Sequence, residues 1–120
     1  MALQESGEMY LESIFVLSKK NQTVHAIDVC EYLGYSKPSV SRAVKILREE
    51  GYVTVEDNGN LCLTKKGLDV AESMYHRHTI LTDFLKELGV STEVASKDAC
   101  KIEHVISEES FSAIKKHLNK

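Results

Sequence analysis

The chain has 120 residues, of which 42% are hydrophobic and 28% are charged, as in an ordinary soluble globular protein. This length allows one compact core or two small modules. The sequence holds no run of about 18 apolar residues, and its polar, acidic N-terminus is unlike a secretory signal, so we expect a cytoplasmic protein that does not enter a membrane. Three cysteines without a C-x-x-C pair do not make a disulfide framework.

The net charge of −3 hides an uneven distribution along the chain. Residues 1–35 carry a net charge of −3, and residues 67–120 carry −2. Residues 36–66 hold six basic and four acidic side chains, a net charge of +2. Local charge matters more than the total for binding a polyanion, so this middle segment is the candidate nucleic-acid contact.

Three helices are expected in the first half of the chain. An apolar stripe from Tyr10 to Leu17 predicts a helix over residues 8–19. A shorter helix over residues 26–33 ends at Gly34. Ser36 is then a favourable N-cap, with Pro38 tolerated in the first turn, and predicts a third helix to about residue 50.

Residues 52–56 and 61–63 are β-prone and are joined by Asp57-Asn-Gly-Asn60. The Asn-Gly pair predicts a tight hairpin in which both turn residues have positive φ. Thr64 then caps a long helix to about Leu88, a further helix starts at Ser91 or Thr92 and runs to about residue 106, and Ser107 starts the last one.

This order predicts a mainly α fold with a small β-hairpin. We expect a winged helix-turn-helix DNA-binding domain over residues 1–66, followed by a helical dimerisation and metal-binding domain over residues 67–120. The expected dimer surface consists of apolar residues of the later helices: Leu81, Phe84, Leu85, Leu88, Phe111, Ile114 and Leu118.

The third helix is the expected recognition helix, which enters the major groove of double-stranded DNA. Arg42 is the candidate for direct guanine readout, and Lys37 and Lys45 are candidates for phosphate contacts. A purely solvated basic face is the alternative interpretation. The full set of expected DNA-binding residues is Ser36, Lys37, Pro38, Ser39, Ser41, Arg42 and Lys45, with Asn58 and Asn60 at the wing tip.

The segment Cys100-Lys-Ile-Glu-His104 is the most informative in the chain. Spacing i, i+3, i+4 places a thiol, a carboxylate and an imidazole on one face of a helix. Met9 and Glu12 form an i, i+3 pair on the first helix, and His78 lies midway along the long helix. Each residue alone has an ordinary explanation, as a packing residue or as part of a solvated face.

Five ordered segments resemble the DtxR/MntR family of iron- and manganese-dependent repressors. They are Glu8-Met-Tyr-Leu11, Ser36-Lys-Pro-Ser-Val-Ser41, Leu63-Thr-Lys-Lys-Gly67, Arg77-His78 and Ala99-Cys-Lys-Ile-Glu-His-Val-Ile-Ser107. The chain ends ahead of the SH3-like C-terminal domain of longer members, so the resemblance implies a short form.

The resemblance also implies metal ligands at Met9, Cys100, Glu103 and His104, which match the iron-type members. Glu12 and His78 match the second site of manganese-type members, so the chain combines features of both. At the positions of two further iron-type ancillary ligands this chain has Thr82 and Ser96. We therefore expect one or two metal ions per chain, with Fe(II) favoured by the sulfur ligands and Mn(II) next.

The implied function is a metal-dependent repressor of metal-ion homeostasis that binds a palindromic operator as a homodimer. The alternative is a winged-helix regulator of the MarR kind that senses a small molecule or an oxidant through Cys100. We expect no enzymatic activity, because no H-E-x-x-H motif or Gly-rich phosphate loop is present. His25, His76 and His117 are expected to be surface side chains, and Cys30 and Cys62 packing residues.

Overall fold

The structure is a computed structural model that describes residues 5–119. It divides into two compact units, residues 1–72 and 73–120, which we call unit 1 and unit 2. The element order is α-α-α-β-β-α-α-α, so the expected mainly α fold with one hairpin is confirmed. Among the described residues, no helix combines the length and the apolar character that crossing a membrane requires.

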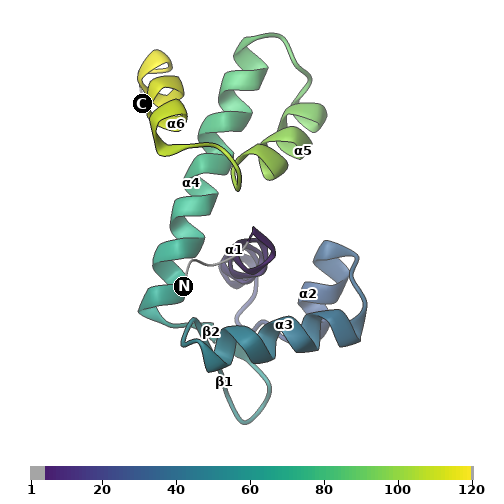
Figure 1. The fold of residues 1–120 in the computed structure, drawn as a ribbon. Coiled ribbons are helices and arrows are strands. Elements are labelled where there is room, and N and C mark those ends of the chain that lie inside the picture. The colour runs from purple at the N-terminus through teal and green to yellow at the C-terminus, as the bar shows by residue number, and fades with distance from the viewer. Residues whose placement is uncertain (1–4, 120) are drawn as a thin grey trace. The chain divides into compact units, whose positions relative to one another are not determined.

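Unit 1 contains three helices and a two-stranded antiparallel sheet, and a fourth helix begins in it (Figure 1). Its elements are α1 (Glu5–Lys20), α2 (Ala26–Leu33), α3 (Lys37–Glu49), β1 (Val53–Val55), β2 (Leu61–Leu63) and the start of α4 (Lys65–Glu87). Helix α1 packs on α2, α3 and β2, and its apolar stripe supplies Leu11 and Ile14 to the core. The predicted periodicity of this helix is therefore correct, although it begins three residues earlier than expected.

The turn between α2 and α3 positions the recognition helix. Gly34 adopts the left-handed conformation with φ 73°, and its N–H donates to the Cys30 carbonyl at 2.8 Å. An L side chain rarely adopts this conformation, so glycine ends α2 here. Ser36 is the N-cap of α3, and its hydroxyl accepts from the Ser39 N–H. Both signals predicted from the sequence are confirmed.

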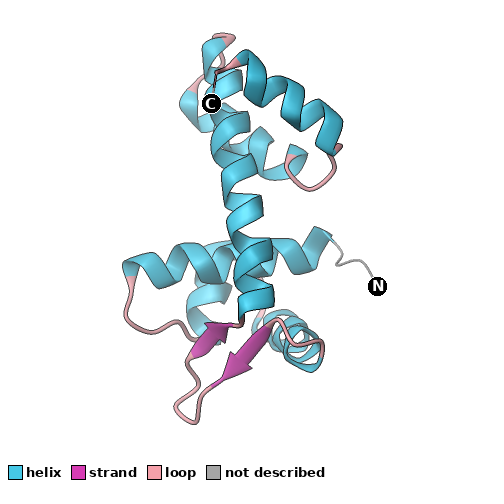
Figure 2. Cartoon of the chain, turned by 90° about the vertical axis from the view of Figure 1, so that its left-hand side faces the viewer, coloured by secondary structure: helices cyan, strands magenta, loops and turns pink. Residues whose placement is uncertain are grey.

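The hairpin differs from the predicted two-residue turn (Figure 2). Val55 pairs with Leu61, and the Glu56 N–H donates to the Asn60 carbonyl, which leaves a three-residue loop over 57–59. Only Gly59 has positive φ, so the expectation for Asn58 is wrong. The reason is Asn60, whose side-chain Oδ1 accepts from the Val24 N–H at 2.8 Å and so fixes this residue directly before β2, outside the turn.

The hairpin joins α4 through a close approach of two backbones. The Thr64 hydroxyl donates to the Gly51 carbonyl at 2.7 Å and accepts from the Gly67 N–H at 3.1 Å. A Cβ atom on Gly67 would lie 2.1 Å from the Tyr52 carbonyl oxygen, which no real contact allows. The first turn of α4 therefore requires glycine at this position because of space, not because of its backbone angles.

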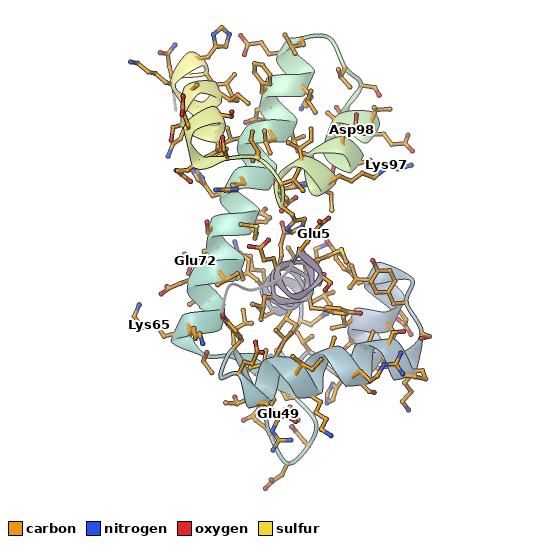
Figure 3. All side chains as sticks on the ribbon, viewed as in Figure 1. Glu5, Glu49, Lys65, Glu72, Lys97 and Asp98 are labelled. Atoms are coloured by element: carbon orange, nitrogen blue, oxygen red, sulfur yellow. The ribbon has the colours of Figure 1, made fainter. Side chains whose placement is uncertain are left out.

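Unit 2 holds the rest of α4, α5 (Thr92–Ile102) and α6 (Glu108–His117). Ser91 and Ser107 cap α5 and α6 through their hydroxyls, as predicted. Lys97 and Asp98 lie on the exposed face of α5 (Figure 3). Because α4 is one continuous helix through residues 66 and 72, the functional boundary at residue 66 stays a prediction.

Helix α5 ends at Ile102, four residues before the predicted end. Arg77 of α4 binds the segment that follows this helix end. Its Nη1 donates to the carbonyls of Glu103 and Ile106 at 3.1 and 3.0 Å, and its Nη2 pairs with the Glu108 carboxylate at 2.9 Å. A fixed cation thus satisfies two carbonyl groups of the segment after α5 that the end of the helix leaves without helical partners.

Candidate metal centre and DNA interface

Met9 and Glu12 lie one turn apart on α1, within unit 1. Glu12 is buried, and Met9 is half-buried. The hydroxyl of Tyr35 donates to the Met9 sulfur at 3.7 Å, and the Tyr35 ring meets the Tyr10 ring edge-on with centroids 6.0 Å apart. Since Tyr35 belongs to the turn before α3, these contacts connect the Met9 side chain to the start of the recognition helix.

Burial raises the pKa of Tyr10, and the neighbouring Tyr35 raises it further. The Tyr10 hydroxyl therefore stays neutral at physiological pH. This pair of aromatic rings is a packing contact between α1 and the helix-turn-helix.

The ligand segment of unit 2 starts in α5 and continues beyond it. Cys100 is exposed on the last turn of α5, Glu103 is the C-cap residue with its N–H donating to the Ala99 carbonyl, and His104 follows in a turn. The sequence placed all three on a helix, but only Cys100 lies within it. Glu103 keeps helical backbone angles, so the i, i+3 relation to Cys100 is preserved.

Glu103 is the most deeply buried acidic side chain among the described residues, with 0% exposure. Its Oε1 lies 3.0 Å from Nδ1 of His78 on α4. A buried carboxylate costs free energy unless donors or cations compensate its charge. With the neighbouring Cys100 and His104, this carboxylate gives unit 2 a set of sulfur, nitrogen and oxygen donors of the kind that binds first-row divalent metal ions.

The six predicted ligands are divided between the two units. Met9 and Glu12 belong to unit 1, whereas His78, Cys100, Glu103 and His104 belong to unit 2. Within unit 2, the structure brings His78 into contact with Glu103. The complete six-residue set stays a prediction.

Four basic side chains of α3 are exposed: Lys37, Arg42, Lys45 and Arg48. No acidic residue lies in the first turn of α3. Ser41 and Pro38 are exposed beside these cations, while the hydroxyls of Ser36 and Ser39 bond to each other at 2.9 Å. The exposed face of α3 therefore has the charge that a helix in the major groove needs.

The two asparagines of the wing have different surroundings. Asn58 is exposed at the loop. Asn60 instead uses its side chain within the unit, where it bonds to Val24 N–H, the Glu56 carboxylate and the Cys62 sulfur. Asn58 is thus the better candidate for a contact with DNA.

Four residues with clear roles were given none by the sequence. The ring of His25, a residue expected at the surface, lies 3.1 Å from the Asn58 carbonyl. The backbone N–H of His25 donates to the Asp28 carboxylate, so this residue connects the wing loop to α2. Arg77, Tyr35 and Ser96 likewise act through non-local contacts. Two of these had a signal in the sequence: Arg77 belongs to the Arg77-His78 segment, and Ser96 occupies the position of an iron-type ancillary ligand.

The fold and these residues define a winged helix-turn-helix regulator with a helical metal-ligand unit. Residues 2–61 match the N-terminal DNA-binding domain of the iron-dependent repressors, and residues 64–120 match their metal-binding and dimerisation domain. The chain therefore belongs to the DtxR/MntR family of metal-dependent transcriptional repressors.

Two relatives illustrate the likeness in sequence. The chain is 32% identical over 120 residues to the HTH-type regulator MJ0568 of Methanocaldococcus jannaschii, covering 98% of this chain and 96% of that protein. It is 33% identical over 102 residues to the HTH-type regulator MntR of Geobacillus kaustophilus, covering 85% of this chain and 72% of that protein.

Solved structures share the architecture. The manganese regulator SloR is 30% identical, with a TM-score of 0.84 over 99% of this chain and 55% of that one. A manganese-dependent repressor in complex with manganese is 27% identical, with a TM-score of 0.85 over 94% of this chain and 52% of that one. The chain spans about half the length of these two solved proteins.

Proposed function

We propose that this chain is a repressor of metal-ion homeostasis genes that binds a palindromic operator as a homodimer when it holds Fe(II) or Mn(II). The observation that carries the proposal is the complete burial of Glu103, between Cys100 and His104, in the segment that matches the family's metal-binding domain. The proposed ligands are Met9, Cys100, Glu103 and His104, with Glu12 and His78 as further candidates.

A bound divalent ion would supply positive charge that several donor atoms share. The chain's own contribution is the division of these donors, because Met9 and Glu12 belong to the DNA-binding unit and the others to unit 2. Ligation by both sets would restrict the recognition helix and reduce the ordering cost of operator binding. Metal affinity and DNA affinity would then be linked reciprocally, typically by about 1–3 kcal/mol.

The choice of ion rests on two opposed arguments. The thioether of Met9 and the thiol of Cys100 are softer than carboxylates and favour Fe(II) over Mn(II). The names of the relatives, MntR and the manganese regulator SloR, favour manganese. We infer Fe(II) from the ligands of this chain, with Mn(II) as the competitor.

On the DNA side, we propose that Arg42 reads a base edge and that Lys37 and Lys45 bind phosphates. Ser41, Pro38 and the capping pair Ser36 and Ser39 would approach the backbone at the start of α3. In the wing, we retain Asn58 and replace the role expected of Asn60 with a structural one, since its side chain is bonded within the unit.

The dimer surface that we propose differs from the predicted one. Leu81 and Phe111 are buried in the single chain and are core residues, not contact residues. Leu88 is 64% exposed, as a contact residue requires, and Val94 and Val105 are further exposed apolar residues of unit 2. We infer that the surface of the homodimer includes these three side chains together with the half-buried Phe84, Leu85, Ile114 and Leu118 of the predicted set. We also propose that the protein acts in the cytoplasm without catalysis.

The oxidant-sensing alternative requires a reactive thiol. Burial and the neighbouring Glu56 raise the pKa of the Cys62 thiol, so it stays protonated and poorly nucleophilic. Only Cys100 is exposed among the three cysteines, and it lies in the proposed ligand set. The match of both units to a metal-dependent family favours the metal sensor over the oxidant sensor.

The test is anaerobic equilibrium dialysis of the metal-free chain against equal Fe(II) and Mn(II), followed by operator binding with and without metal. Glu103→Gln should abolish the metal-dependent gain in DNA affinity, a loss of about 5–150-fold. Glu93→Gln, which changes an exposed carboxylate in the first turn of α5, is the matched control. An unchanged metal response in Glu103→Gln would refute the proposal, as would a response to peroxide but not to a chelator.

A further inference from the structure

The wing loop, residues 57–59, is held to the start of α2 by His25. Its Nε2 lies 3.1 Å from the Asn58 carbonyl oxygen, and because a carbonyl only accepts hydrogen bonds, Nε2 is the donor. The same ring packs against Gly59, where an added Cβ atom would lie 3.2 Å from the ring Cδ2. His25 therefore contacts the loop both by a hydrogen bond and by van der Waals packing.

The neighbouring backbone holds the base of the same loop. The Val24 N–H donates to Oδ1 of Asn60 at 2.8 Å, and the Val24 carbonyl accepts from the Leu61 N–H at 2.7 Å. His25 is itself fixed at the N-cap of α2, where its backbone N–H donates to the Asp28 carboxylate at 2.8 Å and its Nδ1 lies 3.9 Å from the same oxygen. The segment that begins the helix-turn-helix thus sets the position of the wing loop.

These contacts also orient Asn58, an exposed residue of the loop. Its backbone carbonyl accepts from His25, and its side-chain Oδ1 accepts from the Asn60 N–H at 3.0 Å. Since both oxygens are engaged within unit 1, the group that Asn58 offers to a ligand is the Nδ2 amide, a hydrogen-bond donor. This donor suits a phosphate oxygen, and side-chain amides commonly bind phosphates in protein–DNA complexes.

We propose that His25 is a positioning residue for DNA binding, which holds the wing loop so that Nδ2 of Asn58 meets a phosphate group of the DNA. This inference rests on the proposed function, in which Asn58 contacts DNA. A loop that is ordered before binding avoids the entropic cost of being ordered on the DNA. Loss of the His25 ring should therefore weaken DNA binding although the ring itself makes no contact with DNA.

The experiment compares variants that differ in their reach to the Asn58 carbonyl. In His25→Gln the amide retains an N–H donor near the position of Nε2, whereas in His25→Asn the shorter amide ends near the position of Nδ1. Asparagine is also a preferred N-cap residue, so His25→Asn should not impair the start of α2. Asn58→Ala and the double variant His25→Asn with Asn58→Ala complete the set, and His76→Asn, at an exposed histidine of unit 2, is the control.

The measurement is the affinity of each protein, in the presence of Mn(II), for a fluorescent DNA duplex of random sequence. Fluorescence anisotropy gives this affinity at salt concentrations from low to physiological. A random sequence is sufficient because phosphate contacts do not depend on the bases. Thermal unfolding followed by circular dichroism verifies that each variant is folded.

His25→Asn and Asn58→Ala should each lower the affinity by about 2–10-fold, the effect of one neutral hydrogen bond. The double variant should bind no more weakly than Asn58→Ala, because His25 acts through Asn58. His25→Gln and His76→Asn should stay near the wild type. The salt dependence should be the same in all the proteins, because the lost phosphate contact is that of a neutral amide.

Wild-type affinity in His25→Asn, or losses that add up in the double variant, would overturn the inference. A shallower salt dependence in His25→Asn would show that the ring binds a phosphate directly as a cation, and would overturn it as well. No binding by the wild type, even at the lowest salt concentration, would instead refute the proposed function, and this inference with it.

Discussion

Unit 1 and unit 2 bury different kinds of side chains. The described part of unit 1 has thirteen buried apolar residues in one cluster, whereas unit 2 has six, of which two are alanines. Unit 2 also encloses the fully buried Glu103 and exposes Leu88, Val94 and Val105. Unit 1 therefore has the larger apolar core, while unit 2 combines a smaller core with a buried carboxylate and exposed apolar side chains, which are features of surfaces that bind partners.

The two units differ in what stabilises them. Apolar burial contributes about 25 cal/mol per Å², so a large side-chain cluster can hold unit 1 together. For unit 2, we propose that a metal ion and a second copy of the chain add to the stability that its smaller core supplies. We therefore expect the stability of unit 1 to depend little on bound metal, and the stability of unit 2 to depend on it.

The largest expected effect is at the core of unit 1. Leu11 has no exposed surface, so Leu11→Ala should lower the free energy of unfolding by about 3 kcal/mol through lost burial and a cavity. Urea unfolding followed by circular dichroism measures it. Ile46→Ala, at a 54% exposed position, should change the stability by less than about 0.5 kcal/mol. Equal effects of both variants would show that unit 1 has no core of its own.

A bound metal ion should stabilise the chain by almost as much as the Leu11→Ala substitution destabilises it. An ion present at 100 times its dissociation constant stabilises the folded state by about 2.7 kcal/mol if the unfolded chain does not bind it. The melting temperature should therefore rise with Mn(II) concentration, and the rise should vanish in Glu103→Gln. A melting temperature that is independent of metal in the wild type would contradict the expected dependence of unit 2 on bound metal.

Arg77→Met should lower the stability by about 2 kcal/mol, because it removes charge-assisted hydrogen bonds to Glu103 and Ile106 and keeps most of the side-chain volume. Metal affinity should fall with it, since the backbone at Glu103 loses its anchor. Denaturant unfolding and dialysis measure the two effects, and Lys97→Met, an exposed cation of α5, is the control. If Arg77→Met kept the stability and the metal affinity of the wild type, the hydrogen bonds of Arg77 would not be what holds the segment after α5.

Arg42→Ala should have the smallest effect on the free-energy scale and leave folding unchanged. It should weaken operator binding by about 1.5 kcal/mol, roughly tenfold, and relax the sequence preference at one base pair. Lys45→Ala is the matched comparison, since a phosphate contact should weaken all sequences alike and reduce the salt dependence. A uniform loss in Arg42→Ala would reassign this residue to the phosphate backbone.

Local patterns predicted the helices and their caps, because Gly34, Ser36, Ser91 and Ser107 act within a few residues of themselves. The failures have non-local causes. Asn60 opened the hairpin turn by bonding to Val24, a residue 36 positions away. Arg77, on the preceding helix, bonds to the carbonyls of Glu103 and Ile106 in the non-helical segment after α5.

In the candidate site too, local spacing could be predicted from the sequence and non-local contacts could not. The spacing of Cys100, Glu103 and His104 drew attention to the ligand segment. The partner of His78 could not be predicted from spacing, because 25 residues separate it from Glu103. Sequence position identifies ligand types, whereas hydrogen-bond partners depend on how the helices pack.

The junction at Gly67 has a consequence for how related proteins are recognised. Leu63-Thr-Lys-Lys-Gly67 carries the hydroxyl that fastens the hairpin and the glycine that admits the Tyr52 carbonyl, and it contains no proposed ligand. Shared occurrence of this segment is evidence for a common hairpin-to-helix joint. It carries no information on which ion a relative senses, so ion specificity has to be inferred from positions such as Met9 and Cys100 alone.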